Sequence, residues 1–240
     1  QNGVRGGSAT VHFPIWHQEI EDILVLKNNK GTEDNRVRKL DYSIQISKIF
    51  YERFLKNEDI TLFSPHEVPG LYEAFGTEDF DEMYEKYERA YSVPKNKINA
   101  QTLFMELLKE RAETGRIYIM NIDHCNSHSS FDEKGDAGKI NMSNLCQEIT
   151  LPTEPLDSPN DPNGEIALCI LSAINVGQLS NDLKELPELC DLAVRALDEV
   201  IDYQKYPVLA AEYSTINRRS LGIGYIGLAH FLAKNKLKYE

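Results

Sequence analysis

Apolar residues recur at helical spacing in three stretches of the chain. Residues 15–27 carry such a pattern and predict an amphipathic helix. Residues 99–114 predict a second helix, and Gly115 directly after it suits a left-handed C-cap. The longest periodic run covers residues 186–201, and its apolar face needs a sheet or another helix to cover it.

Other stretches have the patterns of strands. Residues 40–46 alternate apolar and polar side chains, which predicts a half-buried strand, and residues 117–122 predict a short buried strand. Another strand is expected over residues 165–174, after the turn-rich residues 152–164, whereas residues 131–142 are polar and predict a loop. Strands that alternate with helices favour an α/β fold, but they do not distinguish an open sheet from a barrel.

Composition and charge narrow the class of protein. Of 240 residues, 41% are apolar and 27% charged, which is typical of one compact globular unit. The net charge of -12 argues against a nucleic-acid or anionic membrane partner. Apolar runs are too short to cross a bilayer and the first residues do not resemble a secretion signal, so we expect a cytoplasmic protein.

Four cysteines are spread along the chain without a CxxC pair: Cys125, Cys146, Cys169 and Cys190. Structural disulfides are improbable without an export signal. Any disulfide formed here is therefore expected to be catalytic.

The string GIGYIG, from Gly222 to Gly227, fits the GxGxxG pattern of dinucleotide-binding proteins. A dinucleotide site needs a strand just before the glycines and an acidic residue about twenty positions later. The preceding residues 217–220 are polar, and the chain ends before that acid. Tight helix packing is the favoured interpretation, and a nicotinamide- or flavin-binding oxidoreductase is the alternative.

The string DHCNSH at residues 123–128 offers several side chains that can bind metals. A structural zinc site usually takes a second pair of ligands from a distant, similarly spaced couple, and the sequence has none. We therefore predict a hydrogen-bonded turn after the strand at 117–122, and no metal site.

A third group of residues combines a thiol, an amide and a carboxylate. Asn144, Cys146 and Glu148 lie in the string NLCQEI, and Cys169 ends the string ALC. In an extended segment, alternate residues project to one side, so the first three would face a common space. From spacing alone, the favoured interpretation is simpler: two small buried cysteines, a turn-forming Asn144 and a surface charge at Glu148.

The strings NLCQEI and ALC resemble the active-site signature of the large subunits of class I ribonucleotide reductases. Further similar segments cover essentially the whole chain in order: QNGVRGG at 1–7, TLFSP at 61–65, GRIY at 115–118, DHCN at 123–126 and RSLGIG at 219–224. A chance match over this length is remote.

The resemblance implies a ten-stranded α/β barrel that holds a finger loop with the radical cysteine at its tip. Cys146 falls on that position, and residues 1–240 would form a partial catalytic barrel domain. The resemblance further implies that a metal-containing small subunit generates a radical, which is relayed to Cys146 as a thiyl. The thiyl then abstracts the 3′ hydrogen of a ribonucleoside diphosphate.

The same resemblance implies roles for other residues. Glu148 matches the general base at the 3′-hydroxyl, and Asn144 matches the amide that orients the ribose. Cys169 matches one half of the redox dithiol that removes the 2′-hydroxyl as water and ends as a disulfide. Gln1 and Arg5 match residues of a loop that senses the substrate base and reports the allosteric effector.

Several parts of such an enzyme have no counterpart in the sequence. The second redox cysteine lies upstream in the family, and neither Cys125 nor Cys190 matches it. Effector-binding segments, the relay tyrosines and the C-terminal reducing cysteines are also missing. We expect both ends of the chain to be cut and the chain alone to be inactive, without a directly bound cofactor. Its expected partners are the small subunit, the remaining large-subunit segments and a second large subunit; a non-catalytic segment that completes a barrel remains an alternative.

Overall fold

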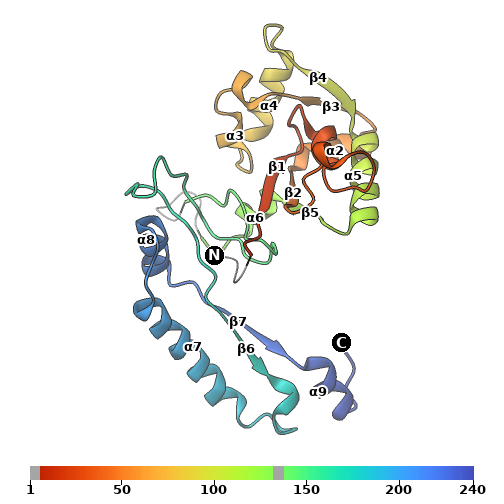
Figure 1. The fold of residues 1–240 in the computed structure, drawn as a ribbon. Helices are drawn as coiled ribbons and strands as arrows, with labels where there is room; N and C mark the ends of the chain where they lie inside the picture. The colour runs from red at the N-terminus through yellow and green to blue at the C-terminus, as the bar shows by residue number, and fades with distance from the viewer. Residues whose placement is uncertain (1–5, 132–137) are drawn as a thin grey trace. The chain divides into compact units, whose positions relative to one another are not determined.

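The structure is a computed structural model that describes residues 6–131 and 138–240. The chain divides into two compact units, Gln1–Pro152 and Thr153–Glu240. The first unit contains β1 (Thr10–Pro14), α1 (Ile20–Leu24), β2 (Asp41–Ile46), α2 (Lys48–Lys56), β3 (Asp59–Leu62), α3 (Leu71–Ala74), α4 (Phe80–Arg89), β4 (Asn96–Asn99), α5 (Ala100–Thr114), β5 (Ile117–Asn121) and α6 (Ile122–Ser127), as Figure 1 shows. The second contains β6 (Leu171–Asn175), α7 (Leu186–Tyr203), α8 (Leu209–Arg218), β7 (Gly222–Ile226) and α9 (Leu228–Lys234).

A parallel sheet in the order β1-β2-β5 is the centre of the first unit. One face of this sheet is apolar because Tyr42, Ile44 and Ile117 project from it into a core that also contains Leu103 and Leu107 of α5. All five side chains are buried. Burial of side chains of this size stabilises the unit by about 1.5–3 kcal/mol each.

The opposite face of the same sheet is polar and yet buried. Ser43 and Gln45 alternate with the apolar residues of β2 and are only 0% and 1% exposed. The predicted strand at 40–46 is confirmed as β2. Its polar side chains, however, face residues 140–149 of the same unit through hydrogen bonds and do not face water.

The predicted helix over residues 15–27 is wrong in its first part and too long. The helical segment is only α1, and the residues before it continue the sheet, because the Ile15 amide donates to the Gln45 carbonyl at 2.9 Å. Trp16 is buried edge-on against Phe75. These apolar residues are thus spaced by contacts with distant parts of the core and not by a helix period. Strand β1 was not predicted.

The helix predicted at residues 99–114 is confirmed as α5. The Asn99 side chain accepts hydrogen bonds from the Gln101 and Thr102 amides, and Gly115 has the expected left-handed conformation with φ of 65°. Strand β5 confirms the prediction at 117–122.

In the second unit, helix α7 confirms the prediction at 186–201, but the strand predicted at 165–174 begins only at Leu171. In α7, Ile201 is buried whereas Leu192, Val194 and Val200 are about half exposed, at 54%, 46% and 43%. Much of the helix's apolar face is therefore left uncovered in the second unit. Within the described residues, no helix is both long and apolar enough to cross a membrane.

The GIGYIG string forms β7, which pairs in parallel with β6, and then the start of α9. A dinucleotide fingerprint places its glycines in the turn between strand and helix, but Gly222 and Gly224 lie within the strand. Gly227 has φ of 74°, and a Cβ there would lie 2.8 Å from Asn175 Oδ1 and 3.0 Å from the Gly177 nitrogen. This geometry supports close backbone packing over cofactor binding.

Candidate active site

Residues 140–149, which we call the Cys146 loop, are bound to the polar face of the β1-β2-β5 sheet. From β1, the Thr10 hydroxyl donates to the Leu145 carbonyl at 2.7 Å. His12 Nε2 lies 3.2 Å from the Ser143 carbonyl and 3.4 Å from its amide nitrogen. The first strand therefore contacts the loop at two residues, Ser143 and Leu145.

The other two strands bind the loop through side-chain amides. Gln45 Nε2 of β2 donates to the Asn141 carbonyl at 2.7 Å. Gln147 of the loop receives a hydrogen bond from the Ser43 hydroxyl and donates through Nε2 to the Ile119 carbonyl of β5 at 2.8 Å. All three strands therefore contribute to the position of the loop.

Helix α6 fixes the beginning of the loop. Asn126 is 3% exposed, donates to the Ile140 carbonyl at 3.1 Å and accepts from the Ile140 amide at 2.8 Å. The DHCNSH segment was predicted to be a hydrogen-bonded turn, and it forms this short helix. Among residues 6–131 and 138–240, no group of three or more His, Cys, Asp or Glu side chains is arranged to hold a metal ion.

The residues around Cys146 form a turn. The Gln147 amide donates to the Asn144 carbonyl at 3.1 Å, and Gln147 has a left-handed φ of 62°. Asn144 Oδ1 accepts from the Ile149 amide at 3.1 Å, as short polar side chains often do near turns. The alternation expected for an extended segment is therefore absent.

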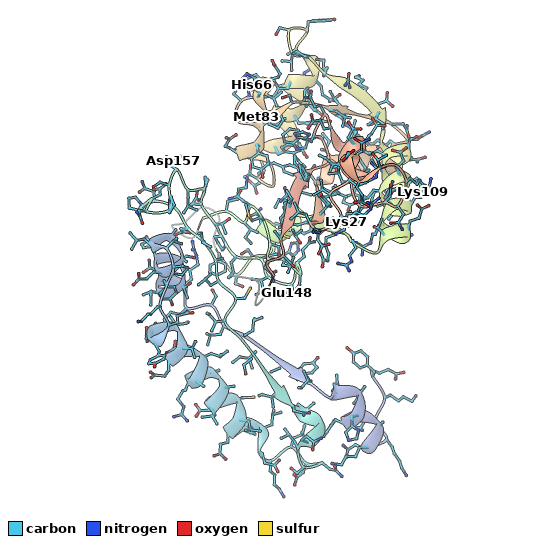
Figure 2. All side chains as sticks on the ribbon, in the orientation of Figure 1. Lys27, His66, Met83, Lys109, Glu148 and Asp157 are labelled. Carbon is cyan, nitrogen blue, oxygen red and sulfur yellow. The ribbon has the colours of Figure 1, made fainter. Side chains whose placement is uncertain are left out.

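The side chains with expected roles differ in exposure. Cys146 and Glu148 are exposed, and Asn144 is half-buried (Figure 2 labels Glu148). The interpretation of Cys146 and Cys169 as small buried hydrophobes is wrong, because both are exposed. Cys169 belongs to the second unit, two residues before β6.

Two of the candidate substrate residues, Gln1 and Arg5, lie outside the residues that the structure describes.

A cavity of ≈ 410 Å³ adjoins the Cys146 loop at the end of β5. Burial raises the pKa of the Cys125 thiol at its wall, and the neighbouring Asp123 carboxylate raises it further. The cavity is lined by Ile119, Met120, Asn121, His124, Cys125, His128, Ser129, Ser130, Gln147 and Thr150.

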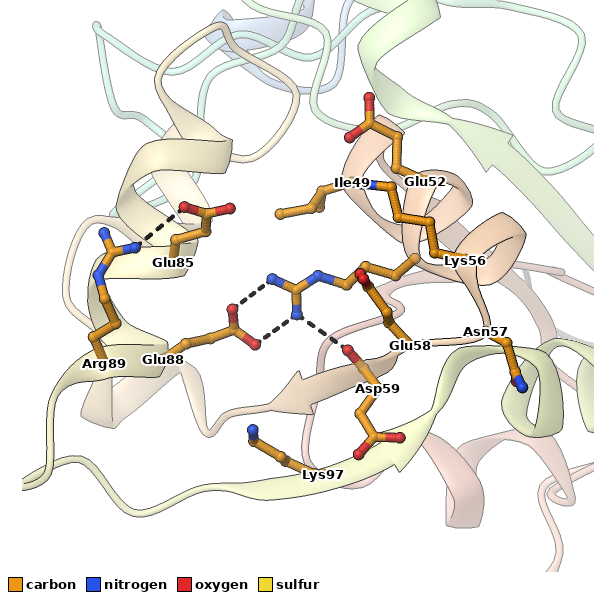
Figure 3. Close-up of a pocket in the computed structure, with 11 residues that line it drawn as sticks. Ile49, Glu52, Lys56, Asn57, Glu58, Asp59, Glu85, Glu88, Arg89 and Lys97 are labelled. Atoms are coloured by element: carbon orange, nitrogen blue, oxygen red, sulfur yellow. Dashed lines mark hydrogen bonds and ion pairs between the residues drawn. The ribbon is translucent and has the colours of Figure 1, made fainter.

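A larger cavity of ≈ 640 Å³ lies elsewhere in the first unit, and its wall is strongly charged (Figure 3). Arg53 makes a two-pronged ion pair with Glu88, with an Nη1–Oε1 distance of 2.6 Å, and also donates to the Asp59 carbonyl at 3.2 Å. Burial by itself raises the pKa of Glu88, but hydrogen bonds from Arg53 and Thr61 hold it below its usual value. These charges are paired with one another, so the cavity has the character of a structural network.

The sequence was compared with known families and proteins after this geometry was established. The family described as "Ribonucleotide reductase, barrel domain" matches residues 1–240. The chain belongs to this family. It is 59% identical to the ribonucleoside-diphosphate reductase subunit alpha of Buchnera aphidicola (from Schizaphis graminum) and 56% identical to subunit 1 alpha of Escherichia coli K12. Each match covers 100% of this chain and 31% of the relative, so the chain spans about a third of their length.

Membership of the ribonucleotide reductase family confirms the resemblance drawn from the motifs. The mixed α/β structure, with parallel sheets β1-β2-β5 and β6-β7, is that of part of the family's barrel domain. Neither sheet closes on itself within residues 6–131 and 138–240.

Sequence reasoning missed the residues that hold the Cys146 loop: His12, Ser43, Gln45, Asn126 and Gln147. A signal for two of them was present. Strands of parallel sheets are usually apolar on both faces, so polar residues at alternate positions of β2 indicate a polar partner over that face.

Proposed function

We propose that the complete protein containing this chain reduces ribonucleoside diphosphates to 2′-deoxyribonucleotides, with Cys146 as the thiyl radical site. The observation that carries the proposal is an exposed thiol on a turn that three parallel strands hold through polar side chains. Its relatives are named ribonucleoside-diphosphate reductases, and they share the whole length of the chain. A reactive sulfur needs both access to substrate and a fixed position.

In the proposed reaction, the Cys146 thiyl takes the 3′ hydrogen atom, so that an S–H bond forms and a C–H bond breaks. Glu148 accepts the proton of the 3′-hydroxyl, and the Asn144 amide orients the ribose. The 2′-hydroxyl leaves as water. Two thiols, Cys169 and a cysteine outside this chain, supply two electrons and end as a disulfide. Return of the hydrogen atom to the 3′ carbon restores the thiyl.

Partners supply what the chain lacks. We propose that a metal-containing small subunit provides the radical, that no cofactor binds this chain directly, and that the large subunit is a homodimer regulated by effectors. Gln1 and Arg5 would sense the substrate base. The rest of the large subunit would complete the barrel domain to which residues 1–240 belong, and the exposed apolar side chains of α7 support such a covering. A dithiol reaction suits the reducing cytoplasm.

The test is substitution of Cys146 in the complete large subunit, assayed with its small subunit. Cys146→Ser should still bind substrate but form no deoxynucleotide, because a hydroxyl does not form a radical as readily as a thiol. Cys190→Ser is the matched control, since Cys190 is also exposed but lies on α7, and it should keep wild-type turnover. Appreciable deoxynucleotide formation by Cys146→Ser would overturn the proposal.

The same experiment separates the competing role of a non-catalytic segment that completes the barrel. In that role, removal of the chain would abolish activity, whereas Cys146→Ser would leave it unchanged.

A further inference from the structure

We propose that Gln147 is a positioning residue that sets the place of the Cys146 sulfur. The inference rests on the proposed function, since it concerns the residue next to the proposed radical site. It starts from an unusual combination at Gln147: a strained backbone and a side chain with two partners on two strands.

The backbone of Gln147 closes the turn that carries Cys146. Its amide donates to the Asn144 carbonyl at 3.1 Å, which makes Cys146 the third residue of a four-residue turn. Its φ of 62° lies in the left-handed region, which is unfavourable for a residue with a Cβ such as glutamine. Some other interaction must therefore favour this conformation.

The side chain of Gln147 provides that interaction. Its Oε1 accepts from the Ser43 hydroxyl of β2, and its Nε2 donates to the Ile119 carbonyl of β5 at 2.8 Å. Ser43 is 0% exposed, so this contact is shielded from water. On the other side of Cys146, the Leu145 carbonyl is held by Thr10 of β1. The peptide on each side of the thiol is thus attached to the sheet.

An amide fits this position chemically because one end must accept from a hydroxyl and the other must donate to a carbonyl. A carboxylate at the same place has no proton to donate and would face the Ile119 carbonyl with like partial charge. A protonated carboxylic acid could again make both contacts. The ionisation state of an introduced glutamate therefore controls whether the turn is held.

Three variants of the complete large subunit test the inference, each assayed for kcat, KM and the midpoint of thermal unfolding. Gln147→Met removes both contacts. Gln147→Asn suits the left-handed backbone better than glutamine does, but its side chain is too short to keep both contacts. Gln147→Glu makes the contacts dependent on pH. Gln101→Met is the matched control, because Gln101 donates to the Phe54 carbonyl at 2.9 Å far from the loop in the sequence.

Misplacement of the sulfur should lower kcat by about ten- to a hundredfold in Gln147→Met and Gln147→Asn, with KM near wild type. Gln101→Met should lose stability but not kcat. The kcat of Gln147→Glu, divided by that of wild type at the same pH, should rise as the pH falls through the pKa of the new carboxyl group. Because the asparagine variant relieves backbone strain, its loss of kcat would separate positioning from folding even where Gln147→Met is unstable.

Wild-type kcat in Gln147→Asn, with a flat pH ratio in Gln147→Glu, would overturn the inference. If Cys146→Ser is inactive in the same assay, only the role of Gln147 has failed. If Cys146→Ser turns over substrate, the proposed function itself has failed.

Discussion

Asn144 Oδ1 accepts a hydrogen bond from the Ile149 amide at 3.1 Å, across the turn that contains Cys146. The oxygen of this amide is thus engaged within its own loop, whereas its nitrogen is the group proposed to serve the substrate. The two ends of one side chain can be separated by substitution.

Asn144→Asp should keep the loop and lose activity, because a carboxylate keeps the acceptor oxygen but has no donor. Asn144→Ala should lose both, since the Ile149 amide is left without its acceptor, at a cost of about 1 kcal/mol. Hydrogen exchange of residues 140–149, measured beside turnover, checks this. Equal exchange protection in the alanine variant and the wild type would contradict the expectation.

The pH dependence of stability should include a contribution from His12. Burial lowers its pKa below 6.5, and the hydrogen bond to the Ser143 carbonyl only partly opposes this shift. The unfolded chain therefore takes up a proton at a higher pH than the folded chain does. The stabilisation is present above about pH 6.5 and is lost as the pH falls toward the lowered folded pKa.

His12→Gln isolates this contribution, because an amide can still donate to the Ser143 carbonyl but does not titrate. Between about pH 7.5 and 5.5, the midpoint of thermal unfolding should fall less in this variant than in the wild type. His17, whose pKa is also lowered by burial, remains in both proteins and cancels in the comparison. Identical falls in the two proteins would show that His12 contributes nothing.

The Arg53–Glu88 pair should be important for the stability of the first unit. The two side chains are only 13% and 16% exposed, so Arg53→Met leaves a largely buried carboxylate without its partner. We expect a loss of about 2–4 kcal/mol, measured by native-state hydrogen exchange in α4. Glu52→Gln is the control, because the Lys48–Glu52 pair is exposed and should be worth less than about 1 kcal/mol. Similar losses in both variants would contradict the assignment.

Gly227 and Gly224 offer a matched test of the packing interpretation of GIGYIG. Gly227→Ala should destabilise the second unit by about 1–2 kcal/mol or more, because it adds a Cβ in the left-handed region against Asn175 and Gly177. Gly224→Ala should be within about 0.5 kcal/mol of wild type, since nothing lies within 4 Å of its Cβ position. Hydrogen exchange in β6 and α9 measures both effects, and equal values would rule out the packing explanation.

The parts of the fold that the sequence predicted well are those with local causes. Helix α5 has its own N-cap in Asn99 and its own C-cap in Gly115, so neighbouring residues define both ends. Residues 15–27 were misassigned because Ile15 and Trp16 are apolar for contacts with the sheet and with Phe75, which no helix period reveals.

The candidate site was predictable as a string but not as a geometry. The contact between His12 and Ser143 joins residues 131 positions apart, so no local pattern indicates it. The expectation of an extended segment failed because Asn144 bonds to the backbone of Ile149 and stabilises a turn. Family resemblance identified Cys146, whereas the loop's attachment to β1, β2 and β5 required the structure.

The most direct measurement of the central claim uses a ribonucleoside diphosphate with deuterium at the 3′ carbon, in competition with the unlabelled substrate. The complete enzyme should discriminate against deuterium, because the Cys146 sulfur takes that atom. Discrimination should persist or increase in Glu148→Gln, where loss of the base slows the same step. Equal use of the two substrates by both proteins would contradict abstraction of the 3′ hydrogen at Cys146.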